Sequence, residues 1–125
     1  MINFLVKSKI SKPVLSIKEI GTEISKHLKS RKVKNAFVEV EIVGGRAMRV
    51  LNLHFMKKDY PTDVLSFPLV EIPGEICSKA KHIGTIVLCN DIIKSNAKKN
   101  ARLERDEFIF VLKHGLDHLL GIHHN

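Results

Sequence analysis

The sequence predicts an α+β fold, with one mixed four-stranded β-sheet and helices packed on it. Two observations lead to this class. Short apolar or alternating segments, typical of strands, are interspersed with segments whose apolar residues recur every three or four positions, as on a helix face. The predicted order is strand, helix, strand, helix, strand, strand, helix, helix. This order favours a single sheet covered by helices.

The first three elements follow from local patterns. Residues 2–6 are a short apolar run, which predicts a strand. Residues 16–30 have apolar side chains at helical spacing, and Ser16 with Glu19 fits a capping box at the start of that helix. Residues 37–43 alternate between apolar and other side chains, so they predict a half-buried strand, which the following two glycines end.

The middle of the chain supplies a helix and two strands. Residues 46–56 have the spacing of a helix with one apolar face. Residues 63–67 predict a strand that Pro68 stops, and residues 82–89 predict another strand.

Two helices are expected to complete the fold. Asn90 or Asp91 is predicted to cap a basic helix that reaches about residue 101. A long helix with an apolar face is predicted over 104–120, and Gly121 stands where a glycine would end it.

The chain is expected to form one domain over residues 1–125. No repeat, low-complexity tract or Gly/Ser linker divides it, and the loop at 72–75 is too short to separate domains. With 44% hydrophobic and 27% charged residues, wholesale disorder is excluded.

A cytoplasmic location is expected. No segment approaches the ~20 apolar residues of a membrane span, and the apolar start is too short for a signal peptide. Cys77 and Cys89 lie twelve residues apart without a CxxC pair, which favours two reduced thiols.

The charge points to a polyanionic partner. The chain has 21 Lys and Arg against 13 Asp and Glu, a net charge of +8, and its pI is near 9.7. Nucleic acid is the first candidate, although basic surfaces also serve solubility. The basic run from Lys94 to Arg105 fits either a phosphate-binding surface or an ordinary solvated helix face.

Histidines near the end of the chain carry the strongest chemical signal. His114 and His118 are four residues apart on a predicted helix, so their rings share one face and can bind one Zn²⁺. Gly121 would turn the chain so that His124 returns to the same ion. This H-x-x-x-H-x-x-G-x-x-H spacing is that of a metzincin-like zinc helix, and three imidazoles leave a position open for water. His123 is the alternative third ligand.

The carboxylate of a metalloprotease is absent from this motif. Such enzymes place a Glu after the first His, whereas this chain has Gly115, so a peptide hydrolase is disfavoured. Asp117 is the nearest carboxylate. Three roles stay open for it: orienting an imidazole from behind the metal ligands, acting as a weaker base, or being a solvated side chain without a role.

Three blocks in order resemble the YbeY family of bacterial single-strand-specific endoribonucleases. They are the histidine segment 114–124, the segment Asp59-Tyr60-Pro61-Thr62-Asp63-Val64-Leu65-Ser66-Phe67-Pro68 with Leu51-Asn52 before it, and Ile83-Gly84-Thr85-Ile86-Val87. The resemblance implies a four-stranded mixed sheet with one Zn²⁺ held by His114, His118 and His124. It also implies a cleft lined by the 62–67 strand, which includes Thr62 and Ser66, along which an extended RNA chain could lie.

The same resemblance implies single-stranded rRNA as substrate, with no membrane or DNA involved. It places the activity in maturation of the 16S rRNA 3′ end and in ribosome quality control, with the small subunit as partner. Either a zinc-bound water or the RNA 2′-OH could attack the phosphate. The alternative, of another class, is an rRNA-binding module whose metal is structural or vestigial.

The chain departs from the family pattern at several positions. Where the family usually has a phosphate-handling Arg, this chain has Met56, so Arg49, Lys57 and Lys58 become the candidates for that contact. Tyr60 is a candidate for base stacking, or it packs within its loop. The other departures are Thr85 and His123 for Asp, Asp117 for Leu, and an end one residue after His124.

Overall fold

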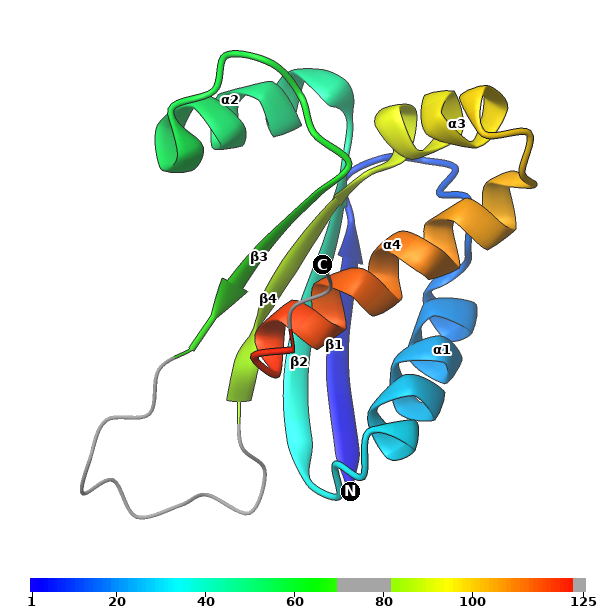
Figure 1. Cartoon of the computed structure of the whole chain (residues 1–125), viewed down its shortest axis with the longest axis vertical. Coiled ribbons are helices and arrows are strands. Elements are labelled where there is room, and N and C mark those ends of the chain that lie inside the picture. Colours follow the sequence, from blue (N-terminus) through cyan, green and yellow to red (C-terminus); the bar gives the residue numbers. More distant parts are fainter. Residues whose placement is uncertain (70–81, 123–125) are drawn as a thin grey trace.

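The computed structural model describes residues 1–69 and 82–122, and its elements follow the predicted order (Figure 1). The predictions for the loop at 72–75, for Cys77, and for His123 and His124 fall outside the described residues. The elements are β1 (Ile2–Ser8), α1 (Ile17–Ser30), β2 (Ala36–Val43), α2 (Gly45–Met56), β3 (Val64–Pro68), β4 (His82–Cys89), α3 (Asn90–Lys99) and α4 (Glu104–Leu119).

The strands form one mixed sheet in the order β1-β2-β4-β3, which confirms the predicted fold class. β1 pairs with β2 and β2 with β4 in parallel, whereas β3 pairs antiparallel with β4 and forms an edge. Because β2 and β4 are parallel, α2 and α3 both begin at the end of the sheet where these strands finish. The turn between α1 and β2 lies at the opposite end.

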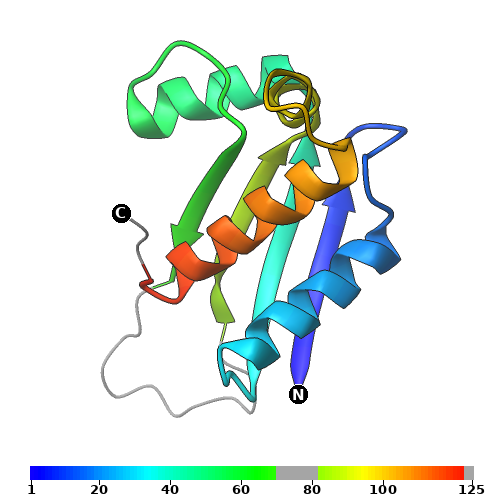
Figure 2. The same cartoon turned by 45° about the vertical axis from the view of Figure 1, so that its right-hand side comes forward.

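One face of the sheet carries the larger core. Helices α1 and α4 lie side by side across this face (Figure 2). Alternate residues of the central strands, such as Val40 and Ile86, meet Ile24 of α1 and Leu112 of α4 there, all fully or nearly fully buried. This alternation is the period-two pattern that the sequence showed in 37–43.

The other face carries a smaller core beneath α2. Val43, Val87 and Cys89 point to this side and meet Met48 of α2 and Leu65 of β3. Burial raises the pKa of the Cys89 thiol, which disfavours the reactive thiolate form.

The helix ends show which local predictions were right. The Ser16–Glu19 capping box is present on α1. Gly121, with φ of 78°, follows α4, and Ile122 N–H donates to the Asp117 carbonyl at 2.8 Å, as in a Schellman motif. The cap prediction for α3 was wrong, because Cys89 is its N-cap residue.

The two residues predicted to cap α3 bind elsewhere. The Asn90 side-chain oxygen accepts from the Val14 N–H, and the Asp91 carboxylate accepts from the Gly45 N–H at 2.7 Å. Asp91 therefore stabilises the first turn of α2, whose N-cap Gly44 has no side chain to do so. Among the helices in the described part of the chain, none is long and apolar enough to cross a membrane.

Candidate functional site

His114 and His118 lie next to each other on α4, as their spacing predicts. Their ring centroids are 4.8 Å apart and the rings are tilted by 47°. His114 is half-buried and His118 is exposed, so both rings lie at a surface that a ligand can reach. Two neighbouring imidazoles are suitable donors for Zn²⁺.

Gly115 brings this part of α4 close to the sheet. A Cβ atom at Gly115 would lie 3.1 Å from Cγ2 of Ile86 and 3.4 Å from Oγ of Ser66. The side of α4 between the two histidines therefore contacts β4 and β3 directly. A Glu at this position would have to displace Ile86, which gives a physical reason for the missing metalloprotease carboxylate. The predicted substrate residue Ser66 lies here, beside the helix that carries the histidines.

The metal site itself is only partly described. The predicted third ligand, His124, lies outside the described residues. Within residues 1–69 and 82–122, no group of three or more His, Cys, Asp or Glu side chains could hold a metal ion. The pair on α4 fits a metal by donor chemistry and by spacing, and the ligand set with His124 stays a prediction.

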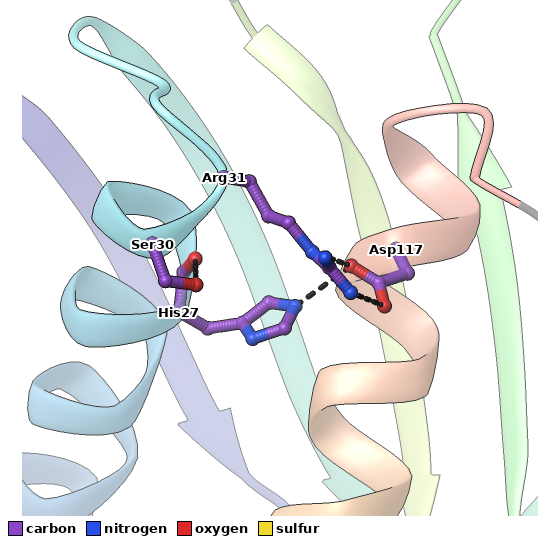
Figure 3. Close-up of polar contacts among 4 residues, drawn as sticks. All are labelled: His27, Ser30, Arg31 and Asp117. Carbon is purple, nitrogen blue, oxygen red and sulfur yellow. Dashed lines mark hydrogen bonds and ion pairs between the residues drawn. The ribbon is translucent and has the colours of Figure 1, made fainter.

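Asp117 is buried, and its carboxylate forms a polar cluster with Arg31 and His27 (Figure 3). Arg31 donates from Nε to Oδ1 at 3.0 Å and from Nη2 to Oδ2 at 2.8 Å, and His27 Nε2 lies 2.7 Å from Oδ1. The carboxylate raises the pKa of Arg31 above its ordinary value through these hydrogen bonds. The interpretation of Asp117 as a solvated side chain was wrong, because the residue is 2% exposed.

Sequence reasoning missed the two partners of Asp117. His27 falls on the apolar face of α1, between Ile24 and Leu28, and a polar side chain at such a position signals a buried partner. No local signal identified Arg31, because it acts across 86 residues of sequence.

Two of the residues predicted to bind phosphate, Arg49 and Lys57, already have hydrogen-bond partners within the protein. Arg49 forms a two-bond ion pair with Asp59, with distances of 2.8 and 3.1 Å. This pair lowers the pKa of Asp59 and raises that of Arg49. A phosphate would have to compete with Asp59 for this guanidinium. Lys57 follows α2 in a left-handed conformation, and its Nζ donates to the His54 carbonyl at 3.2 Å.

The loop after α2 places the remaining candidates. Asn52 donates to the Tyr60 carbonyl at 2.7 Å, which fixes the loop, and the Tyr60 side chain is exposed. Lys58 is exposed, and the Thr62 hydroxyl lies 3.4 Å from the Asp63 carboxylate. The ring centroids of Phe55 and Phe67 are 5.0 Å apart, so the end of α2 lies beside β3. Of the predicted substrate residues, Ser66 lies against α4, whereas the others belong to α2 and the loop after it.

The mixed four-stranded sheet and the helices packed on it define an α+β domain, and a similar fold is found in another solved structure. This is the solution structure of TM1509 from Thermotoga maritima, with a TM-score of 0.66 and 26% identity, over 98% of this chain and 75% of that one. The family model described as Endoribonuclease YbeY matches residues 5–125. The chain belongs to the YbeY family.

Curated relatives support the same assignment. The chain is 41% identical over 87 residues to a protein named Endoribonuclease YbeY from Nitratiruptor sp., covering 70% of this chain and 56% of that protein. A protein of the same name from Sulfurovum sp. is 36% identical over 95 residues, covering 76% of this chain and 65% of that protein. The chain thus spans little more than half the length of the curated relatives it matches.

Proposed function

We propose that this protein is a metal-dependent endoribonuclease that cuts single-stranded RNA. The observation that carries the proposal is the pair His114 and His118, whose ring centroids are 4.8 Å apart on α4. Gly115, between them, lets this helix lie close against the edge strand β3. The names of the curated relatives support an activity on RNA.

His114 and His118, together with His124, would hold one Zn²⁺. When bound, the ion supplies a Lewis acid and lowers the pKa of a coordinated water to near 7. The chain supplies the positioning. The cluster of Asp117, His27 and Arg31 fastens the end of α4 to α1, and with both Asp117 oxygens engaged we assign it to positioning rather than to a base.

The edge of β3 would receive the RNA. Among the strands of residues 1–69 and 82–122, β3 pairs with β4 alone, and Ser66 places its hydroxyl beside Gly115. An extended single strand fits along such an edge more easily than a duplex. We propose rRNA as the substrate, in maturation of the 16S rRNA 3′ end on the small ribosomal subunit in the cytoplasm.

Metal analysis combined with cleavage tests the proposal. Purified protein should carry about one zinc per chain, and His118→Ala should lose the metal and the cutting of single-stranded RNA while RNA binding is retained. His54→Ala, which removes an exposed histidine on α2, is the matched control and should keep both. Stoichiometric zinc without cutting would favour the second candidate, an rRNA-binding module. Met56 favours that candidate, because it stands where the family pattern has a phosphate-handling Arg.

A further inference from the structure

The turn that joins α1 to β2 concentrates positive charge. Residues 26–34 contain five of the 21 Lys and Arg and no Asp or Glu. Arg31 binds Asp117, whereas Lys29, Lys32 and Lys34 are exposed. Among the described residues, no carboxylate lies within ion-pair distance of these three lysines. They are therefore available to an anionic ligand.

The turn has a fixed backbone and lines one side of a hollow. Val33 N–H donates to the Leu28 carbonyl at 3.0 Å, and Lys32 N–H donates to the Lys29 carbonyl at 2.9 Å. An open hollow of about 510 Å³ lies here, lined by Met1, Ile2, Lys29, Lys32, Val33 and Lys34. Lysines thus border a partly apolar depression, on which a ribose or a base could pack while phosphates meet the ammonium groups.

The turn is linked to the histidine-bearing end of α4 through Arg31. Lys32 directly follows Arg31, whose guanidinium binds the residue before His118. Helices α1 and α4 run side by side and finish at the same end of the sheet (Figure 2). An RNA strand leaving the histidines towards α1 would therefore meet these lysines.

The basic run predicted on α3 is placed differently. Lys94, Lys98 and Lys99 belong to α3, which begins where β4 ends, at the opposite end of the sheet from the turn. The two arginines of that run have partners, because Arg105 pairs with Glu19 and Arg102 lies over the Phe110 ring.

We propose that Lys29, Lys32 and Lys34 form a phosphate-binding surface that holds the RNA strand beside the histidine pair. This inference rests on the proposed endoribonuclease function. Lysine is a compact point charge that recognises phosphate without reading the base, so the surface would strengthen binding regardless of sequence.

The test compares two variants of equal charge. One carries Lys29→Gln, Lys32→Gln and Lys34→Gln, and the control carries Lys94→Gln, Lys98→Gln and Lys99→Gln. Both lower the net charge from +8 to +5, and all six side chains are exposed, so folding should be unaffected. Binding of a fluorescent single-stranded RNA is measured by anisotropy over a range of salt concentrations, and cleavage kinetics are measured in parallel.

In the turn variant, the slope of log affinity against log salt concentration should become shallower by about 2. Three lysines are removed, and each phosphate contact on a single strand contributes about 0.7 to this slope. Its affinity at about 50 mM salt should fall at least ~10-fold, and the loss should be larger for an RNA of about 20 nucleotides than for one of about 5. KM should rise more than kcat falls. The control should retain most of the slope.

Three outcomes decide the matter. The proposed surface is overturned if the turn variant binds RNA like the wild type, or if the control variant loses as much RNA affinity as the turn variant. Wild-type protein that binds RNA through the turn but cuts nothing, with zinc present, would contradict the proposed function and support the surface. Equal loss of binding to an acidic protein and to RNA in the turn variant would overturn the assignment to RNA.

Discussion

The two faces of the sheet differ in how firmly they hold their helices. On the face of α1 and α4, a large buried core is joined by the Asp117 cluster and by the close contact at Gly115. On the other face, α2 buries Met48 and Asn52 but exposes most of its remaining large apolar residues, which are Val50, Leu53, Phe55 and Met56. The predicted metal ligands His114 and His118 lie on α4 and so belong to the firmer face, which suits a metal site because ligands need tightly held supports. Local opening is expected first at α2.

Cavities in the two cores should have different costs. Leu112→Ala removes a fully buried side chain from the larger core, and we expect a loss of about 4–5 kcal/mol in the free energy of unfolding. Met48→Ala in the smaller core should cost about 2–3 kcal/mol, because its half-exposed neighbours can relax into the space. Urea denaturation measures both, and equal losses would contradict the difference between the faces.

Two glycines on the firmer face should respond differently to alanine. Gly84 has φ of 145°, and a Cβ there would lie 2.5 Å from the Phe67 carbonyl oxygen and 2.7 Å from Cδ2 of Leu119. Gly84→Ala should therefore cost about 2–4 kcal/mol. Gly115→Ala needs only a small shift of Ile86 and improves helix propensity, so the change should stay within about 1 kcal/mol. If thermal unfolding showed a larger loss of stability for Gly115→Ala than for Gly84→Ala, these close contacts would not be what determines the cost of the two substitutions.

The charged cluster on the firmer face should matter more than the ion pair on the other side. Asp117→Asn weakens two hydrogen bonds from Arg31 and one contact with His27 in a buried place, and we expect a loss of about 1–3 kcal/mol. Arg31 keeps access to water at 37% exposure, which limits the cost. Zinc affinity measured by competition with a chelator should fall as well, and Asp117→Glu should also lower it if the geometry of α4 is what matters. Unchanged metal affinity would leave Asp117 a purely structural residue.

The smallest expected effect concerns Arg49. Asp59→Asn removes the exposed carboxylate that holds this arginine, and RNA affinity should rise a few-fold as the guanidinium becomes available. Because the ion pair lowers the pKa of Asp59, any stability it adds is present above the ordinary pKa of a carboxyl group and is lost as the pH falls through the lowered value. Stability at neutral pH should barely change, since exposed pairs contribute little. Weaker RNA binding in this variant would show that Asp59 itself serves the site.

The sequence by itself determined the features that depend on neighbours along the chain. The 3.6-residue period set His114 beside His118, the Ser16–Glu19 capping box began α1, and Gly121 ended α4. Each of these interactions joins residues only a few positions apart, so local geometry suffices to predict it.

Tertiary structure alone decided what the charged side chains do. Asp117 meets partners 86 and 90 residues away, and Asp91 caps a helix 46 residues before it instead of its own. Arg49, predicted to hold phosphate, instead holds Asp59. A charge binds whichever opposite charge or unpaired N–H the fold brings within about 3 Å, and burial strengthens that preference. The physical reason is that pairing depends on positions in space, which the local periodicity of the chain does not specify.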